Sequence, residues 1–230
     1  MMEQQSVQTV EQNPEQMPQT ENNKKSSFLS DAAEVLETVL VSVFVVIMLF
    51  AYIIRPVTVD GKSMNNTLQD GDRLLMSDFL FHPSYGDIVI VNNEHSYLLD
   101  ENNAVVEGSG LPDEKRLIKR VIATGGQTVD IDFNSGVVSV DGKELDESAY
   151  AYDYVMDVNT NNATTVDEGA FTYPVKIPEG YCFVMGDNRK NSTDSRSFYV
   201  GFIPEDAILG KAVWRISGSG FGSIYKNLKS

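Results

Sequence analysis

The chain has 230 residues, 42% of them hydrophobic, which is enough for one sizeable core and a small appendage. Its 33 acidic side chains outnumber its 18 lysines and arginines, and the resulting formal net charge of -15 leaves no broad basic surface for nucleic acid. The single cysteine, Cys182, lies in an apolar run, so a disulfide framework is excluded and a buried, inert thiol is expected.

The N-terminal part changes abruptly from polar to apolar. Residues 1–30 are mostly polar and show no apolar period, which predicts a disordered tail. The next segment contains 17 uncharged residues, 38–54, and residues 31–55 are predicted to form one transmembrane helix. A signal peptide and a buried helix of a soluble domain are the alternatives. The run is longer than the usual ~7 to 15 apolar residues of a signal peptide, and it is also longer than a buried helix normally requires. Basic residues flank both sides, so charge alone does not fix the orientation.

After Pro56 the sequence has the patterns of β-strands. Short alternating or apolar runs are separated by Gly-Asp turns and a Gly-Gly pair, and residues 129–142 alternate on both sides of an Asn-Ser-Gly turn, which predicts a hairpin. We therefore predict a mainly β fold, with an antiparallel sheet or barrel-like domain at 56–230 and a smaller hairpin cap inserted at about 126–180. The glycine-broken segment 217–230 is expected to be loosely held. The other predicted strands lie within 56–61, 72–77, 86–91, 115–126, 181–187 and 207–217.

Few residues suit metal chemistry. His82 and His95 are the only histidines, neither lies in a metal-binding motif, and both are expected to be surface or turn residues. No serine lies in a G-x-S-x-G elbow. The segment "DNRKNSTDSR" is acidic, but an arginine at position three and the lack of glycine at position six exclude a calcium loop of the EF-hand type. We expect no metal and no organic cofactor.

Lysine remains as a candidate general base. Lowering the pKa of a lysine from about 10.4 to about 8 requires roughly 3 kcal/mol in favour of the neutral form, and burial can supply this. In "RLIKRVI", period-two alternation places Leu117, Lys119 and Val121 on one face, where Lys119 has apolar neighbours. The alternative is a solvent-exposed gatekeeper lysine on an edge strand.

Four segments together resemble a known family. They are "SMNNTL" at Ser63, "YGDIVI" at Tyr85, "RLIKRVI" around Lys119 and "GDNRKNSTDSR" at Gly186. In order and spacing, after a predicted N-terminal anchor, they resemble the sequence boxes of bacterial type I signal peptidases. No single box is specific, whereas the four in order are.

The resemblance implies a Ser-Lys dyad, with Ser63 as the nucleophile and Lys119 as the general base of an acyl transfer. Ser192 would form a hydrogen bond with the lysine amine and hold its direction. The resemblance also implies two supporting charge pairs, which are Asp194 with Arg196 and Asp187 with Arg120.

The sequence departs from the family pattern at two positions. Gly61 stands where some members have a hydroxyl residue that helps to bind the oxyanion, so the second oxyanion donor is left open. Asn66 stands where the family usually has proline, which makes the turn after the nucleophile less preorganised. Gly186, Asn188 and Arg189 are interpreted as scaffold.

An extended substrate peptide is expected to pair with residues 57–61 and with the strand of Lys119, by β-augmentation. The resemblance implies shallow apolar pockets that admit Ala, Gly or Ser, which suits an Ala-x-Ala-like cleavage site. Ordinary core packing is the alternative for each lining residue, above all for Met64 and Leu68. The implied lining residues are Val57, Val59, Met64, Leu68, Leu117 and Ile118.

The resemblance further implies a single-pass plasma-membrane protein, with a cytoplasmic N-terminus and an extracytoplasmic catalytic domain. Ser63 follows the apolar run by only about nine residues, which would keep the nucleophile near the bilayer surface where a cleavage site emerges. The expected partners are preproteins with signal peptides and the lipid bilayer, with no nucleic acid, and the protein is expected to be a monomer.

The predicted function is therefore a membrane-anchored serine endopeptidase that removes signal peptides from secreted preproteins. One alternative is a noncatalytic, membrane-anchored relative that serves as a binding or assembly factor, for which a missing serine or lysine would be the signature. A self-cleaving Ser-Lys regulator is another, but such proteins are normally soluble and carry a DNA-binding module. The apolar run and the acidic charge argue against it.

Overall fold

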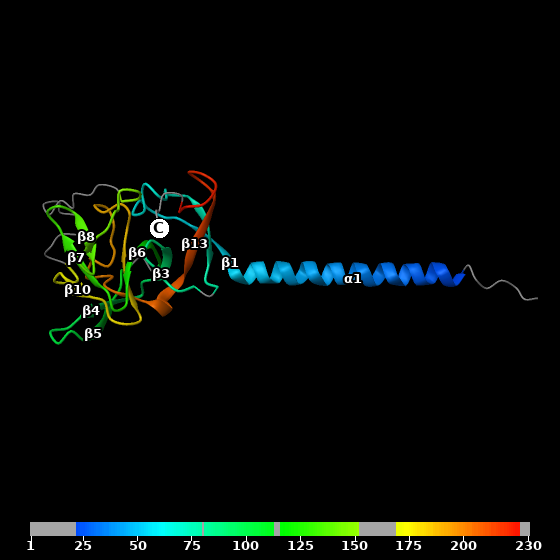
Figure 1. Ribbon diagram of the computed structural model, residues 1–230, viewed down its shortest axis with the longest axis horizontal. Helices are drawn as coiled ribbons and strands as arrows, with labels where there is room; N and C mark the ends of the chain where they lie inside the picture. Colours follow the sequence, from blue (N-terminus) through cyan, green and yellow to red (C-terminus); the bar gives the residue numbers. More distant parts are fainter. Residues whose placement is uncertain (1–21, 80, 113–115, 152–168, 226–230) are drawn as a thin grey trace, which may run out of the picture. The chain divides into compact units, whose positions relative to one another are not determined.

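The computed structural model describes residues 22–79, 81–112, 116–151 and 169–225 (Figure 1). The chain divides into two compact units, Met1–Phe50 and Ala51–Ser230. Most of one long helix, α1 (Asn22–Ile53), belongs to the first unit, and every strand of the described chain belongs to the second. The predicted tail lies outside the described residues from 1 to 21.

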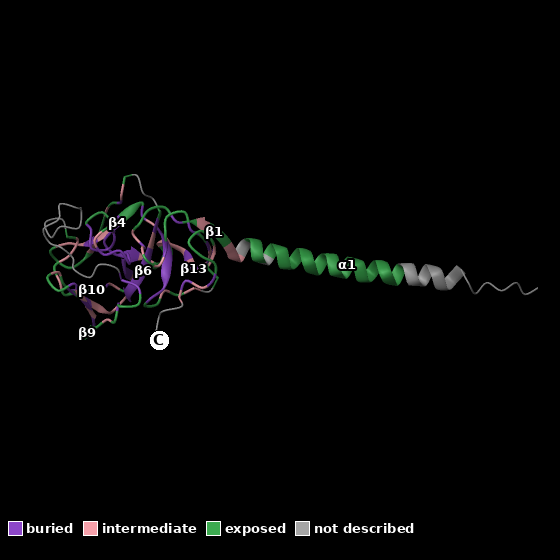
Figure 2. Cartoon of the chain, turned by 90° about the horizontal axis from the view of Figure 1, so that it is seen from above, coloured by how far each residue is buried: buried purple, intermediate pink, exposed green. Residues whose placement is uncertain are grey.

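Helix α1 begins at Asn22, whereas the sequence predicted a helix start near Asp31 and a tail over residues 1–30. Lys, Leu, Ala and Glu are good helix formers and extend the helix beyond the apolar run. Large apolar residues of α1 are exposed, including Phe44 at 61% and Ile47 at 59%. Figure 2 shows most of the helix in the colour of exposed residues. Within the described part of the chain, no helix has the length and apolarity required of a membrane span.

The larger sheet has seven strands in the order β1-β2-β13-β3-β6-β11-β12, and all neighbours are antiparallel. This confirms the mainly β, antiparallel prediction, and each run predicted to contain a strand does so. The strands are β1 (Ile54–Thr58), β2 (Arg73–Ser77), β3 (Ile88–Asn92), β6 (Arg116–Thr124), β11 (Tyr181–Met185), β12 (Ile203–Pro204) and β13 (Ile208–Ser217).

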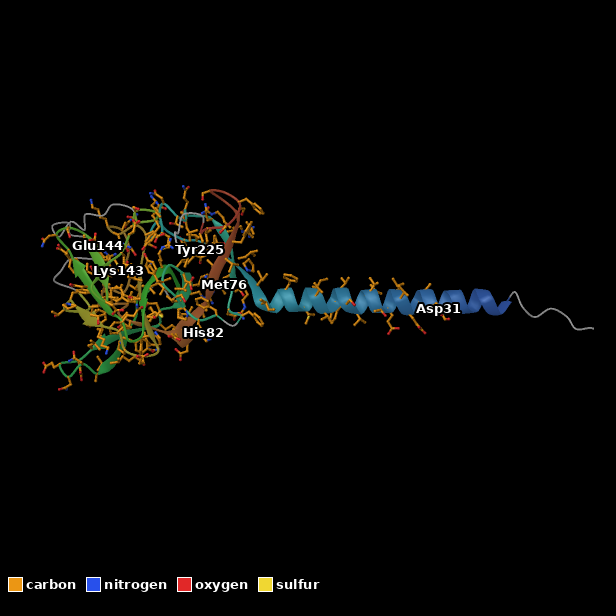
Figure 3. All side chains as sticks on the ribbon, viewed as in Figure 1. Asp31, Met76, His82, Lys143, Glu144 and Tyr225 are labelled. Atoms are coloured by element: carbon orange, nitrogen blue, oxygen red, sulfur yellow. The ribbon has the colours of Figure 1, made fainter. Side chains whose placement is uncertain are left out.

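A second sheet has four antiparallel strands in the order β10-β7-β8-β9, and we call it the cap sheet. The predicted hairpin is present as β7 and β8, and the Asp132 carboxylate accepts a hydrogen bond from the Asn134 N–H in its turn. Figures 1 and 3 show the cap sheet, with Lys143 and Glu144, at the opposite end of the domain from β13. The strands are β7 (Thr128–Asp132), β8 (Val137–Val140), β9 (Lys143–Glu144) and β10 (Val175–Lys176).

A third element is a two-stranded ribbon of β4 (His95–Leu99) and β5 (Val105–Ser109), which the sequence did not predict. His95 begins a strand rather than lying in a turn. The polar residues before it and the glycine within β5 conceal the strand pattern, although the burial of β4 alternates residue by residue.

Apolar clusters join these elements. Phe183 and Met185 of β11 pack with Ile131 and Val138 of the cap sheet, so the two sheets share one core. Burial raises the pKa of the Cys182 thiol to about 12, in agreement with the expected inert cysteine.

The C-terminal segment is held more firmly than predicted, as far as Tyr225. The Tyr225 hydroxyl donates a hydrogen bond to the Ala212 carbonyl at 2.7 Å and accepts one from the Ile88 N–H at 3.0 Å. Ile224 is buried in the same core as the loop after β1. The expectation of a loose end is therefore wrong for residues 217–225, because an aromatic hydroxyl and an isoleucine anchor this glycine-rich stretch.

Candidate active site

The predicted nucleophile lies in the loop between β1 and β2, which we call the serine loop (residues 61–68). Gly61 has φ of +88°, a left-handed conformation that favours glycine over the hydroxyl residue found in some members of the family that the sequence resembles. Beyond Ser63 the Leu68 N–H donates to the Met64 carbonyl at 2.8 Å. Met64 and Leu68 are 1% and 0% exposed, so their burial fixes the loop on the sheet while Ser63 stays partly exposed.

Lys119 lies on β6 and its Nζ donates a hydrogen bond to the Ser63 Oγ at 2.8 Å. The side chain is 3% exposed, and Leu117 and Val121 are buried as the alternation predicted. A gatekeeper lysine would project into solvent, so the structure contradicts that alternative. The structure brings the amine and the hydroxyl, 56 residues apart in sequence, within reach for proton transfer.

The segment that begins at Gly186 holds the serine loop in place. The Asn188 N–H donates to the Ser63 carbonyl at 3.0 Å, and the Asn188 amide side chain donates to the Lys62 carbonyl at 3.1 Å. A Cβ on Gly186 would lie 2.5 Å from the Ser63 carbonyl oxygen and 2.2 Å from the Ser192 Oγ, so only glycine allows this approach. Gly186 and Asn188, which were predicted to be scaffold residues, therefore contact the serine loop directly.

Ser192 lies beside this segment and is 4% exposed. Its hydroxyl donates to the Asp194 Oδ2 at 2.7 Å. A hydroxyl has one proton to donate. Because the Ser192 hydroxyl donates its hydrogen bond to Asp194, its oxygen remains free to accept a hydrogen bond from a lysine amine.

Both charge pairs implied by the resemblance are present and buried. Arg120 binds the Asp187 carboxylate through Nε at 2.8 Å and Nη2 at 2.7 Å, and Arg196 binds Asp194 with its Nε 2.8 Å from Oδ1. Burial alone would raise the pKa of Asp194. The Arg196 guanidinium and the Gly186 N–H and Ser192 hydroxyl hydrogen bonds outweigh burial and hold that pKa below its usual value.

A third buried ion pair was not predicted. Arg189 donates to both carboxylate oxygens of Glu147, with Nη2 2.6 Å from Oε1, and the two side chains are 1% and 3% exposed. The Tyr150 hydroxyl also donates to Glu147 Oε1, at 3.0 Å. No local pattern around Glu147 indicates its partner 42 residues further along the chain.

A cavity of about 710 Å³ opens beside Ser63 and Lys119. Five of the six predicted substrate-binding residues line it, and the sixth, Leu68, is fully buried in the core, where ordinary packing explains it. β6 pairs with β11 only from Arg120 onward, so within the described chain its first half has β3 as its one neighbouring strand. The five that line the cavity are Val57, Val59, Met64, Leu117 and Ile118.

The histidines lie elsewhere. His82, labelled in Figure 3, is exposed, and the Nδ1 of the exposed His95 lies 2.9 Å from the Glu107 Oε1. Neither lines the cavity.

Comparison with known proteins is consistent with this site. The family model described as "Signal peptidase, peptidase S26" matches residues 32–217. A probable signal peptidase I-1 of Synechocystis is 31% identical over 185 residues, which are 79% of this chain and 81% of the relative. Signal peptidase I T of Bacillus subtilis is 31% identical over 177 residues, 76% and 79% of the two chains.

A solved structure of a signal peptidase I from Enterococcus faecalis aligns with 58% of this chain and 98% of its own, at 23% identity and a TM-score of 0.35. Family membership rests on the sequence matches. The chain belongs to the signal peptidase family, peptidase S26. The predicted resemblance to bacterial type I signal peptidases, and the prediction that the protein is an enzyme of this class, are thereby confirmed.

Proposed function

We propose that this protein removes signal peptides from secreted preproteins, with Ser63 as the nucleophile and Lys119 as the general base. The observation that carries the proposal is the 2.8 Å contact between the Lys119 Nζ and the Ser63 Oγ at the wall of a cavity. Burial of an amine disfavours its charged form, and the uncharged amine is the form that accepts a proton. The cavity is large enough for several residues of an extended peptide.

In the proposed reaction, the Ser63 oxygen attacks the scissile carbonyl carbon while its proton passes to the Lys119 amine. The tetrahedral intermediate breaks its C–N bond, and the lysine returns the proton to the leaving amine. Water then attacks the resulting ester, again with Lys119 as base, and releases the Ser63 hydroxyl. This mechanism needs no metal and no organic cofactor.

The Ser63 backbone N–H is the proposed first donor to the oxyanion. Gly61 offers no side-chain donor, and its N–H already donates to the Asp70 carboxylate at 2.9 Å. The second donor therefore has to come from another group that lines the cavity.

The proposed substrate is an extended segment that enters between two strand regions. Residues 57–64 and residues 116–119 both line the cavity. β1 is an edge strand that pairs with β2, and the first half of β6 pairs with β3 alone, so both strands have backbone groups available to a peptide. The apolar side chains of Val57, Met64 and Ile118 favour small residues next to the cleaved bond, as in an Ala-x-Ala-like site.

We further propose that α1 anchors a monomeric enzyme in the plasma membrane, with the N-terminus in the cytoplasm and the catalytic domain outside. The exposed apolar side chains along α1 and the uncharged run at 38–54 support this. The full chain should remain with the membrane during alkaline carbonate extraction, and external protease should reach the catalytic domain in intact spheroplasts. Release by carbonate, or protection of the domain, would refute the anchor or its orientation.

The dyad is tested with the full chain in detergent and a preprotein as substrate. Ser63→Ala and Lys119→Ala should each abolish cleavage after the small residue, while the matched controls Ser135→Ala and Lys143→Ala, at exposed positions of the cap sheet, should cleave normally. Cleavage that persists in either dyad variant would refute the catalytic roles. If the wild type itself does not cleave the preprotein, the noncatalytic binding role gains the support it now lacks.

A further inference from the structure

Glu147 and Tyr150 lie on one turn that follows β9, and between them they contact two of the buried arginines around the candidate site, Arg189 and Arg120. The turn is closed by hydrogen bonds from the Tyr150 and Ala151 N–H groups to the Glu147 carbonyl, at 3.1 and 2.9 Å. Glu147 is 4% exposed and Tyr150 is 6% exposed. We call residues 147–151 the clamp turn. Neither side chain lines the cavity beside the dyad, so each acts through other residues.

The first set of contacts runs from Glu147 to the serine loop. Arg189 donates to both Glu147 oxygens, and its Nε donates to the Gly186 carbonyl at 3.1 Å. Between Gly186 and Arg189 the chain presents the Asn188 N–H to the Ser63 carbonyl. The Glu147 carboxylate thereby fixes one end of the segment that holds the nucleophile.

The second set of contacts runs from Tyr150 to the lysine strand. The Tyr150 ring lies 4.1 Å from the guanidinium carbon of Arg120, and its hydroxyl is 3.0 Å from the Tyr85 hydroxyl. Arg120 follows Lys119 on β6 and binds Asp187, whose carboxylate accepts a hydrogen bond from Thr67 of the serine loop. The same turn thus supports both halves of the dyad.

The burial of these charges calls for an explanation other than stability. A buried ion pair contributes little or nothing compared with apolar side chains of the same size, because both ions lose their hydration. The ion pair instead fixes the orientation of both side chains, because a guanidinium and a carboxylate form a bidentate hydrogen bond. The Glu147–Arg189 pair is therefore better explained by geometry than by folding energy.

We propose that Glu147 and Tyr150 are positioning residues, which hold Ser63 in alignment with Lys119. The proposal rests on the function proposed above. A small displacement of one reacting group lowers the rate of the chemical step and leaves substrate binding almost unchanged. The effect should therefore appear in kcat rather than in KM.

The test uses the full chain in detergent and a preprotein substrate, with kcat, KM and Tm measured for each variant. Glu147→Gln keeps the volume and one oxygen, and Tyr150→Leu removes the ring beneath Arg120. Each should lower kcat by about 10- to 100-fold with KM within about threefold of the wild type. Val138→Ala, at a buried cap-sheet residue of the apolar core, is the matched control: it should lower Tm but keep kcat within about twofold.

If kcat of both clamp-turn variants stays within about threefold of the wild type, or if Val138→Ala loses as much kcat as they do, the positioning role is overturned. Should Glu147→Gln fail to fold, Tyr150→Leu decides by the same criterion. Wild type and Ser63→Ala are run in parallel: a wild type that does not cleave, or a Ser63→Ala that does, refutes the proposed function instead.

Discussion

The two ends of the catalytic domain are built on different principles. Around the dyad the interior contains three buried ion pairs, of Arg120, Arg189 and Arg196 with carboxylates. The core beneath the cap sheet contains apolar side chains, including Val138, Ile131 and Phe183, and aromatic contacts such as Phe171 on Phe202.

This difference shows that the interactions that stabilise the fold are distinct from those that orient individual side chains. Apolar burial stabilises the fold but fixes directions weakly, because many arrangements of similar volume pack nearly as well. Hydrogen-bonded charges stabilise little and fix directions strongly. The part of the domain that must hold an amine against a hydroxyl is the part that contains the buried charges, and substitutions at the two ends should therefore affect different measurements.

The largest effect is expected at Asp194. Asp194→Asn leaves the buried Arg196 without a counter-charge, and removal of one partner of a buried pair typically lowers the free energy of unfolding by about 3 to 5 kcal/mol. Because Asp194 also accepts from the Gly186 N–H and the Ser192 hydroxyl, cleavage should be lost too. Urea unfolding and a cleavage assay measure both quantities, and an Asn variant that keeps wild-type stability would contradict the role assigned to this pair.

The same carboxylate predicts part of the acid sensitivity. Its pKa is lower in the folded chain than in the unfolded chain, where an aspartate titrates near about 3.9. The native state therefore gains stability from this group at neutral pH, and the gain declines as the pH falls below about 4 and through the lower folded pKa. Unfolding of the wild type measured between pH 7 and pH 3 should show a steeper loss than Asp194→Asn, and parallel curves would contradict the prediction.

A core substitution at the other end should affect stability alone. Ile131 of β7 is 5% exposed within the shared apolar core, so Ile131→Ala should lower the free energy of unfolding by about 2 to 5 kcal/mol through lost burial and a cavity. Under conditions where the variant is fully folded, its kcat should equal that of the wild type. A strong fall in kcat at full folding would show that the two ends are not separable.

The sequence predicted the elements that depend on local pattern. The strands around Lys119 and the hairpin at Asn134 follow from alternation and turn chemistry, and the pairing of Lys119 with Ser63 follows from four ordered boxes. The Glu147–Arg189 pair was not predictable, because the sequence around one residue contains no pattern that indicates the other. The two side chains meet only in the folded domain. The ribbon containing His95 was missed because polar residues before β4 and a glycine within β5 conceal the strand pattern, and the alternation of β4 is visible only in its burial.

The smallest effect is expected where a contacting pair of polar side chains lies in solvent. His95 and Glu107 approach to 2.9 Å, but their side chains are 52% and 56% exposed. Exposed pairs gain little because water and salt screen them and because two side chains must be ordered. His95→Gln should therefore change the free energy of unfolding by less than about 0.5 kcal/mol and leave kcat unchanged. Urea unfolding of His95→Gln beside Asp194→Asn provides the direct contrast. If both substitutions lowered the free energy of unfolding equally, burial would not explain the large effect expected at Asp194.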